Sequence, residues 1–362
     1  MDPTRVLVVE DSQTIRKYIV EILETTPGFE VAGEAGDGKA AIELCERLAP
    51  DVISMDMMLP VMTGLSATEY IMAYCPTPIL VVSASTNRGE LFRTYDALAA
   101  GAVDVLEKPS GSEPDDAWAR QLVEALRLVS RVRVITHLRG RLGPTRHAAS
   151  AALASVPLPG TPTRPARVVS IGASTGGPGA VLDLLSTLPS GFALPILLVI
   201  HIAEPFAQAM AEWLAAQTGI PVRYARHDEA LSRAARAVLM APPGRHLELN
   251  NGRLRLDDGP ERHSCKPSVD VLFESLAREA GEQTIACLLT GMGKDGAAGM
   301  LAVRAAGGLT IAQDEATSVV WGMPGEAVAL DAASHVLPLR DIGSFLAAVP
   351  RASREVVRET KE

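Results

Sequence analysis

The chain has 362 residues, which is enough for two or three domains. Hydrophobic residues make up 47% and charged residues 21%, a balance typical of a soluble globular protein. Aromatic residues reach only 4%, so the core must be mostly aliphatic. The formal net charge of −9 argues against non-specific binding to nucleic acid, because the phosphate backbone is also negative.

The N-terminal residues favour a cytoplasmic protein. They run straight into the apolar stretch Arg5–Glu10, without the basic segment, apolar core and cleavage site of a signal peptide. No apolar run reaches the roughly 18 residues that a membrane span needs, so we expect no membrane insertion. The chain has four cysteines: Cys45, Cys75, Cys265 and Cys287. None forms a C-x-x-C pair, which favours a reduced chain without structural zinc.

Residues 1–127 alternate short apolar runs with amphipathic stretches. Four runs are typical of buried parallel strands: Arg5–Glu10, Asp51–Asp56, Pro78–Ser83 and Asp104–Lys108. Between them, apolar residues recur at helical spacing: Ile15, Ile19, Ile22 and Leu23, then Ala41, Leu44, Cys45 and Leu48. This alternation predicts a doubly wound, parallel-sheet α/β domain.

A linker follows this domain. A helix is expected from Asp116 to about Arg141, and residues 128–166 are predicted to be first helical and then rich in Pro and Ala. Small residues separate five prolines there, which favours a semi-flexible chain. The prolines are Pro144, Pro157, Pro159, Pro162 and Pro165.

The strand and helix alternation resumes in residues 167–350, which predicts a second parallel-sheet α/β domain. Asn251-Gly252 separates L-E-L from R-L-R-L and strongly predicts a β-hairpin, so an antiparallel excursion is expected within this domain. Residues 351–362 are predicted to be a polar, solvated tail.

Five polar residues lie at or just after strand ends in the first domain: Glu10, Asp11, Asp56, Ser83 and Lys108. The carboxyl ends of parallel strands meet at one crevice, so these side chains should lie together. Carboxylates there would form a hard oxygen site suited to Mg²⁺, and an aspartate beside the metal can accept a phosphoryl group. Each acid alone is more typical of a solvated strand end or a helix cap; the combination indicates a site.

The stretches V-V-E-D-S, M-D-M-M-L-P-V-M-T-G, V-V-S-A-S and L-E-K-P resemble the response-regulator receiver family over essentially all of this domain. By that resemblance Asp56 is the phosphoacceptor, and a histidine kinase is the phosphodonor. Ser83 and Lys108 would sense the phosphoryl group. The implied Mg²⁺ ligands are Glu10, Asp11, Asp56 and the Met58 carbonyl.

Three apolar runs of the second domain end at residues suited to acyl transfer. V-V-S-I-G-A-S-T-G-G places Ser174 in G-x-S-x-G, the pattern of a serine on a tight strand-to-helix turn. V-I-H ends a second run at His201, and L-L-T-G-M-G-K-D-G carries Asp295. His201 is the best candidate base for Ser174, and Asp295 would orient the imidazole. Backbone N–H groups at Thr175 or Met292 would form an oxyanion hole.

Other interpretations of these residues stay open. Ser174 is equally typical of a helix N-cap, His201 of a core histidine, and Asp295 of a cap on the following helix. Other residues compete for the base and nucleophile roles: His246, His263 and Cys265. The order Ser–His–Asp excludes a standard α/β-hydrolase, whose order is Ser–Asp–His.

Residues 291–296 also match the dinucleotide fingerprint G-x-G-x-x-G, with Asp314 near the distance of a ribose-binding acid. Two observations disfavour that alternative. The motif falls late in the domain, and Asp295 would place a carboxylate where the pyrophosphate should bind.

Four stretches resemble the chemotaxis-type receptor methylesterase family (CheB-like): I-G-A-S-T-G-G-P, K-P-S-V-D-V-L-F, L-L-T-G-M-G-K-D-G-A-A-G-M and A-Q-D-E-A-T-S-V-V-W-G-M-P. The resemblance, over about Val168 to Pro338, implies a Ser174, His201 and Asp295 triad with the Met292 N–H in the oxyanion hole. It implies hydrolysis of glutamate methyl esters on chemoreceptor helices without a cofactor, and receptor glutamine deamidation in many members. The alternative from another class is a phospho-switched module that only docks on receptors.

The chain departs from these families at a few positions. Glu10 stands where receivers more often have Asp, and Val105 stands where they usually have an aromatic switch residue. Methylesterases usually have Q-H-M-P around the histidine, whereas this chain has Ile200, His201, Ile202 and Ala203. They usually have His-Arg where this chain has Cys265-Lys266. The groove beside the triad is therefore expected to differ.

Overall fold

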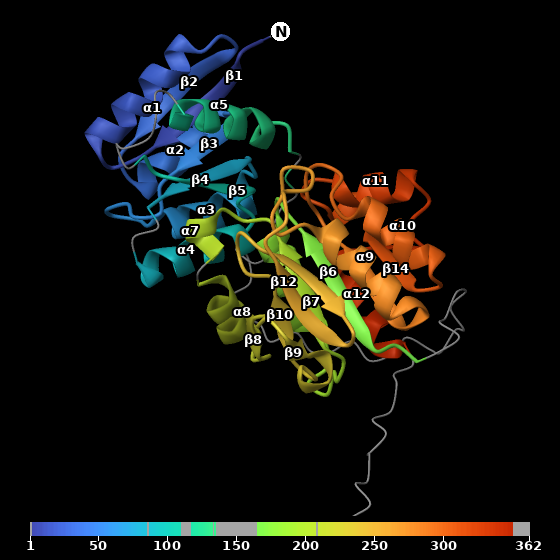
Figure 1. Ribbon diagram of the computed structural model, residues 1–362. Coiled ribbons are helices and arrows are strands. Elements are labelled where there is room, and N and C mark those ends of the chain that lie inside the picture. Colours follow the sequence, from blue (N-terminus) through green and yellow to red (C-terminus); the bar gives the residue numbers. More distant parts are fainter. Residues whose placement is uncertain are drawn as a thin grey trace, which may run out of the picture. The chain divides into compact units, whose positions relative to one another are not determined.

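The computed structural model describes residues 2–84, 87–109, 117–132, 134, 165–207 and 209–349. They form two compact units, and each contains a large parallel sheet (Figure 1). The predicted α/β class is confirmed, because helices connect the parallel strands in both sheets. Of the predicted linker 128–166, the structure describes residues 128–132, 134, 165 and 166; the rest of it and the predicted tail 351–362 lie outside the described residues.

The first sheet has five parallel strands in the order β2-β1-β3-β4-β5. Its strands are β1 (Thr4–Val9), β2 (Phe29–Ala35), β3 (Val52–Met55), β4 (Ile79–Ser83) and β5 (Asp104–Glu107). Its helices are α1 (Gln13–Thr25), α2 (Gly38–Leu48), α3 (Gly64–Tyr74), α4 (Arg88–Ala99) and α5 (Ala117–Val129). Four of them begin at a side-chain cap that accepts a first-turn N–H: Ser12, Asp37, Thr63 and Asn87.

The apolar runs predicted four of these strands but missed β2. That strand lies at the edge of the sheet, and only its two end residues, Phe29 and Ala35, are buried. Glu30 and Glu34 face solvent within it, so no continuous apolar run marks it in the sequence.

The helix expected from Asp116 to about Arg141 is shorter than predicted, because α5 ends at Val129. Arg131 and Val132 donate their N–H groups to carbonyls three residues back, so the chain tightens into a turn there. Val132 and Val134 are β-branched and disfavour continued helix, and Val134 packs against the core of this unit.

The second sheet has seven parallel strands in the order β15-β14-β13-β6-β7-β10-β8, and a small sheet has the order β11-β12-β9. The strands are β6 (Val168–Ala173), β7 (Ile196–Ile200), β8 (Val222–Tyr224), β9 (Glu229–Ala230), β10 (Val238–Met240), β11 (His246–Asn250), β12 (Arg253–Asp257), β13 (Thr284–Leu288), β14 (Leu309–Gln313) and β15 (His335–Leu337). The helices are α6 (Gly177–Thr187), α7 (Glu204–Ala207), α8 (Met210–Thr218), α9 (Val269–Glu279), α10 (Ala297–Ala305), α11 (Met323–Ala329) and α12 (Leu339–Ala348).

The predicted hairpin is confirmed: β11 and β12 pair antiparallel across Asn251-Gly252. Both turn residues have positive φ, 49° and 71°, which matches the right-handed twist of the two strands. The inward-facing leucines of the hairpin are buried in the same core as α9: Leu247, Leu249, Leu254 and Leu256. The hairpin therefore supports α9 from the side.

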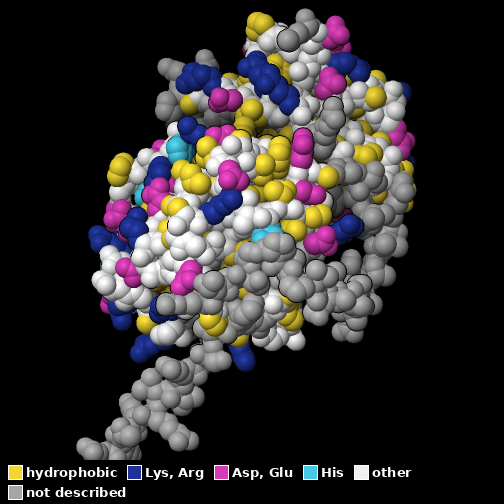
Figure 2. All heavy atoms as spheres, turned by 90° about the vertical axis from the view of Figure 1, so that its right-hand side faces the viewer, with side chains coloured by type: hydrophobic (Ala, Val, Ile, Leu, Met, Phe, Trp, Pro, Cys, Tyr) yellow, Lys and Arg dark blue, Asp and Glu magenta, His cyan; other side chains and the backbone are white. Residues whose placement is uncertain are grey.

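Every residue of the central strands β6, β7 and β13 is buried, as expected for a sheet covered on both faces. Figure 2 shows acidic and basic side chains interspersed over the face that it presents. Within the described residues, none of the helices combines the length and apolar character needed to cross a bilayer.

Two glycines allow α9 to approach β6 closely. A Cβ on Gly172 in β6 would lie 2.3 Å from Val269 Cγ1, and one on Gly296 would lie 2.7 Å from the same atom. Gly296 also has φ of +92°, which disfavours other residues there. The first turn of α9 is therefore held against the ends of β6 and β13.

Gly172→Ala should destabilise the second unit by about 1–3 kcal/mol, because the added methyl group overlaps Val269. Urea unfolding would measure the change in the free energy of unfolding, and the m-value should be the same in the variant and the wild type. Gly191→Ala is the matched control, since no atom lies within 4 Å of its added Cβ. Equal unfolding midpoints for the two variants would contradict the close packing of β6 and α9.

Candidate active site

The predicted acidic cluster forms at the carboxyl edge of the first sheet. Glu10 directly follows β1, Asp56 directly follows β3 and Lys108 directly follows β5. One carboxylate oxygen from each of Glu10, Asp11 and Asp56 lies within 4.8 Å of the others. The Lys108 Nζ is 2.8 Å from Glu10 Oε2 and 3.0 Å from Asp56 Oδ2, so one ammonium group bridges two carboxylates.

The carboxylates fit a hard dication. Glu10 and Asp56 are each only 1% exposed, and Asp56 Oδ1 has no hydrogen-bond partner among the described residues. Burying an unpartnered carboxylate oxygen is costly, and Mg²⁺ is a ligand that would satisfy it. Burial also raises the pKa of Glu10, although its hydrogen bond from Lys108 lowers it. A bound dication would favour the ionised form.

The other residues of the predicted receiver site lie on neighbouring strands. Ser83 ends β4, is fully buried, and donates its hydroxyl to the Ala84 carbonyl at 3.3 Å. The Lys108 N–H donates to the Ser83 carbonyl, which ties the ends of β4 and β5 together. Val105 in β5 pairs with β4 and packs on the core. Met58 exposes its side chain; the role of its carbonyl stays a prediction.

Ser174 and His201 come from adjacent strands of the second sheet. Ser174 directly follows β6, His201 directly follows β7, and the last residues of these strands, Ala173 and Ile200, pair in register. The His201 N–H donates to the Ala173 carbonyl at 2.9 Å, so the pairing continues to the histidine itself. Gly176, with φ of 74°, turns the chain from Ser174 into α6. The sheet thus brings both residues to its carboxyl edge.

Asp295 lies at the N-terminus of α9. Its carboxylate accepts the Ser268 hydroxyl at 2.7 Å, the Val269 N–H at 2.7 Å and the Asp270 N–H at 3.1 Å. Ser268 is the N-cap of α9, so these donors belong to the positive end of that helix. Asp295 therefore binds a neighbouring helix, rather than acting merely as a cap on α10.

His201 and Asp295 form a hydrogen-bonded ion pair. The His201 Nε2 lies 2.9 Å from Asp295 Oδ2. Burial alone would raise the pKa of Asp295, but the hydrogen bonds from His201 and Ser268 outweigh it and lower that pKa. Burial alone would lower the pKa of His201, but the hydrogen bonds with Asp295 and Cys265 raise it to about 9. Nδ1 is the ring nitrogen that Asp295 leaves available.

Of the three alternative candidates for base or nucleophile, the structure places only one next to His201. His246 accepts the Ser268 N–H at Nδ1 and donates from Nε2 to the Pro260 carbonyl, so both ring nitrogens serve the fold. His263 bonds Asp270 at 3.1 Å instead of Asp295. Cys265 does reach the site, because its sulfur lies 3.7 Å from His201 Nδ1.

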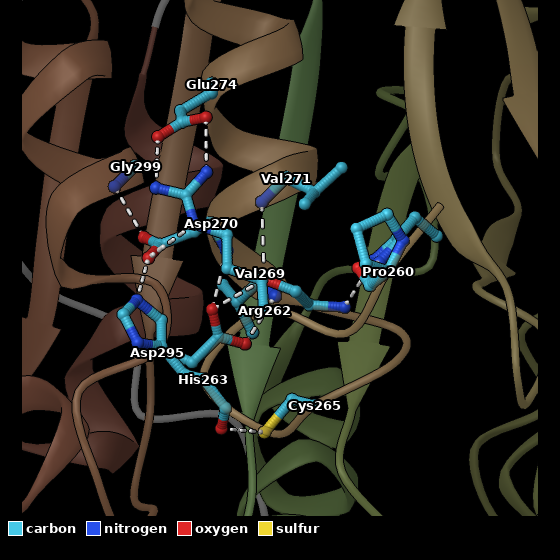
Figure 3. Close-up of polar contacts among 12 residues, drawn as sticks. Pro260, Arg262, His263, Cys265, Val269, Asp270, Val271, Glu274, Asp295 and Gly299 are labelled. Atoms are coloured by element: carbon cyan, nitrogen blue, oxygen red, sulfur yellow. Dashed lines mark hydrogen bonds and ion pairs between the residues drawn. The ribbon is translucent and has the colours of Figure 1, made fainter. Parts of the chain in front are cut away.

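A second buried carboxylate stands beside Asp295 and was missed by sequence reasoning (Figure 3). Asp270 is fully buried, accepts the Gly299 N–H at 2.6 Å, and has the Arg262 guanidinium 3.7 Å away. Burial raises the pKa of Asp270, and the nearby charge of Asp295 adds to this. One signal in the sequence could have found Asp270: the motif K-P-S-V-D places a capping serine and this aspartate at the start of a helix.

The two predicted oxyanion-hole residues lie in different surroundings. Thr175 is buried, whereas 39% of Met292 is exposed. The loop that carries Met292 is fixed because the Gly291 N–H donates to Val320 while the Gly291 carbonyl accepts the N–H groups of Gly322 and Met323. A fixed loop suits an oxyanion hole, and the role of these N–H groups stays a prediction.

Comparisons with known proteins identify the family. Residues 169–346 match the CheB methylesterase model and residues 6–115 match the response regulator receiver domain. "Protein-glutamate methylesterase/protein-glutamine glutaminase 2" of Anaeromyxobacter dehalogenans (strain 2CP-C) is 46% identical over 98% of both chains. The chain belongs to this methylesterase family. "Protein-glutamate methylesterase/protein-glutamine glutaminase 4" of Myxococcus xanthus (strain DK1622) is 42% identical over 97% of this chain and 98% of the relative's chain.

A solved structure resembles the methylesterase part. The Thermotoga maritima CheB methylesterase catalytic domain is 34% identical, with a TM-score of 0.48, over 50% of this chain and 97% of that chain.

We expect the His201 imidazole to titrate at about 9, above the ordinary value of 6.5, in an NMR titration of labelled histidine. Asp295→Asn removes the carboxylate charge and should shift the pKa back down. Asp341→Asn, an exposed acid on α12, is the control and should leave it unchanged. Since folding raises this pKa, the pair stabilises the fold below pH 6.5, and that stabilisation disappears as the pH rises through about 9. A midpoint at or below 6.5 would contradict the ion pair.

Proposed function

We propose that the chain is a phosphorylation-regulated protein-glutamate methylesterase that hydrolyses glutamate 5-O-methyl esters on chemoreceptor helices. The observation that carries this proposal is the His201–Asp295 pair beside the strand end that bears Ser174. Family membership supports the substrate class, because the relatives are named for this activity. The site of action would be the cytoplasmic part of the receptor.

In the proposed reaction, the Ser174 hydroxyl oxygen attacks the ester carbonyl while Nδ1 of the unprotonated His201 ring takes its proton. The N–H groups of Met292 and Thr175 stabilise the negative oxygen of the tetrahedral intermediate. The C–O bond to the methoxy group then breaks, and His201 returns the proton so that methanol leaves. Water attacks the acyl-enzyme by the same route and releases glutamate.

Asp295 orients the ring throughout. Its carboxylate holds the Nε2 proton, and four hydrogen bonds from His201, Ser268, Val269 and Asp270 fix its position. This arrangement stabilises the imidazolium that forms when Nδ1 is protonated. No metal or organic cofactor is required for these steps.

For regulation, we propose that Asp56 accepts a phosphoryl group from a histidine kinase. Glu10, Asp11 and Asp56 would hold Mg²⁺, with the Met58 carbonyl, and the ion would neutralise charge at the phosphoryl oxygens when bound. Lys108 and Ser83 would bind those oxygens. We infer that the unphosphorylated receiver restrains the esterase and that phosphorylation releases it.

Two other functions remain to be weighed: a second reaction at the same site, and receptor binding without any reaction. Deamidation of receptor glutamines would use the same acyl-enzyme with ammonia as leaving group, as the names of the relatives suggest. A phospho-switched module that only docks on receptors is the alternative. It would not require a buried aspartate held by a helix N-terminus beside a histidine.

Ser174→Ala should lower methanol release from methylated receptor membranes by about 10³-fold or more, because the nucleophile is removed. Ser232→Ala, an exposed serine of the same domain, is the matched control and should keep full activity. Receptor binding by the Ser174→Ala variant should persist. Undiminished release from this variant would exclude the serine mechanism, and no release from the wild type would favour the docking module.

Asp56→Ala should abolish the stimulation of methanol release by a small-molecule phosphodonor with Mg²⁺, while basal release persists. Asp51→Ala is the control, because Asp51 is exposed and lies at the opposite end of β3. The measurement is the ratio of rates with and without donor for each variant. A stimulation that survives in Asp56→Ala would contradict the regulatory model.

A further inference from the structure

We infer that Cys265 and His201 form a binding site for a thiophilic dication, Zn²⁺, that blocks the esterase. The Cys265 Sγ lies 3.7 Å from His201 Nδ1, and both side chains are only partly buried. One donor atom from each of His201, Cys265 and Asp295 lies within 4.8 Å of the others. Sulfur and imidazole nitrogen are donors that zinc takes in proteins.

The backbone at Cys265 is held in place by a tight turn. Arg262 and Cys265 exchange backbone hydrogen bonds of 3.1 and 2.9 Å, and the two residues between them, His263 and Ser264, both have positive φ. Neither is glycine, so the turn is strained and needs outside support. Arg262 supplies it with a bidentate ion pair to Glu274 on α9 at 2.6 and 2.7 Å, which Figure 3 shows.

His263 adds a second tether between the turn and α9. Its Nε2 lies 3.1 Å from the buried Asp270 carboxylate. Two side-chain contacts with α9 therefore fix the backbone from which Cys265 faces His201. A fixed donor loses little conformational freedom when it binds a metal, which favours affinity.

The spacing of the two donors suits tetrahedral zinc. Zn–S bonds of about 2.3 Å and Zn–N bonds of about 2.0–2.1 Å place the two donor atoms about 3.6 Å apart at a tetrahedral angle. The Cys265 Sγ to His201 Nδ1 distance is 3.7 Å. The ion would therefore need little movement of either side chain, and water would fill the remaining positions.

Asp295 would act through the histidine rather than bind the ion. Its Oδ2 accepts from His201 Nε2 and the Val269 N–H, and its Oδ1 accepts from Ser268 and the Asp270 N–H. Direct ligation would break some of these bonds. A carboxylate on the far nitrogen of a metal-bound histidine fixes the ring and strengthens the ligand.

Zinc and the proposed catalysis would compete for one atom. His201 Nδ1 is the nitrogen that takes the Ser174 proton in the proposed function, on which the inhibitory part of this inference rests. Binding would form Zn–S and Zn–N bonds and release the thiol proton, together with the Nδ1 proton where the ring is charged. Affinity should therefore rise with pH.

The first test is a titration of the full-length chain with Co²⁺, a spectroscopic substitute for Zn²⁺. We expect a thiolate-to-cobalt absorption band that Zn²⁺ displaces and that Cys265→Ser abolishes. Cys75→Ser is the matched control, since Cys75 is also partly exposed but lies in the first unit. Asp295→Asn should weaken cobalt binding by about 10–100-fold. Absence of the band in the wild type, or its persistence in Cys265→Ser, would overturn the site.

The second test measures methanol release against Zn²⁺ concentration. The wild type and Cys75→Ser should be inhibited alike, and the zinc concentration for half inhibition should rise at least about tenfold in Cys265→Ser. Equal sensitivity of Cys265→Ser would refute inhibition through this thiol. A wild type that binds cobalt but releases no methanol even with chelator would leave the metal site intact and contradict the proposed esterase.

Discussion

The candidate active site depends on one carboxylate that the first turn of one helix holds in place. The Asp295 carboxylate accepts hydrogen bonds from the Ser268 hydroxyl and from the first two N–H groups of α9. The first N–H groups of any helix have no partner within the helix, so an acceptor outside it must satisfy them. The carboxylate thereby stays ionised although it is buried, and it keeps one oxygen toward His201. Without that anchor, the histidine would have no fixed orientation and no stabilised charge.

Close packing around α9 brings the first turn of that helix within hydrogen-bond distance of Asp295. Gly172 and Gly296 leave space that any side chain would fill, and Val269 occupies it. The hairpin supports the same helix from the side through Leu249, whose N–H donates to the Ser275 hydroxyl on α9. A change at either glycine would therefore alter the site through α9, without touching Ser174 or His201.

Charge balance is the second constraint. Asp270 and Asp295 are buried side by side: the Arg262 guanidinium lies 3.7 Å from the first, and His201 bonds the second. The first sheet solves the same problem differently, with Lys108 bridging Glu10 and Asp56. In both places two carboxylates are buried close together, and burial strengthens every charge interaction there.

The sequence by itself determined the two α/β folds, the hairpin and the candidate residues, because apolar runs, helical spacing and Asn-Gly act locally. It missed the edge strand β2, whose charged residues hide it, and extended α5 beyond Val129. Only the tertiary structure decided which histidine Asp295 binds, that His246 serves the fold, and that Cys265 faces His201 Nδ1. Those contacts join residues 14 to 94 positions apart, and a chain pattern carries no information about which distant side chains meet once helices and sheets pack.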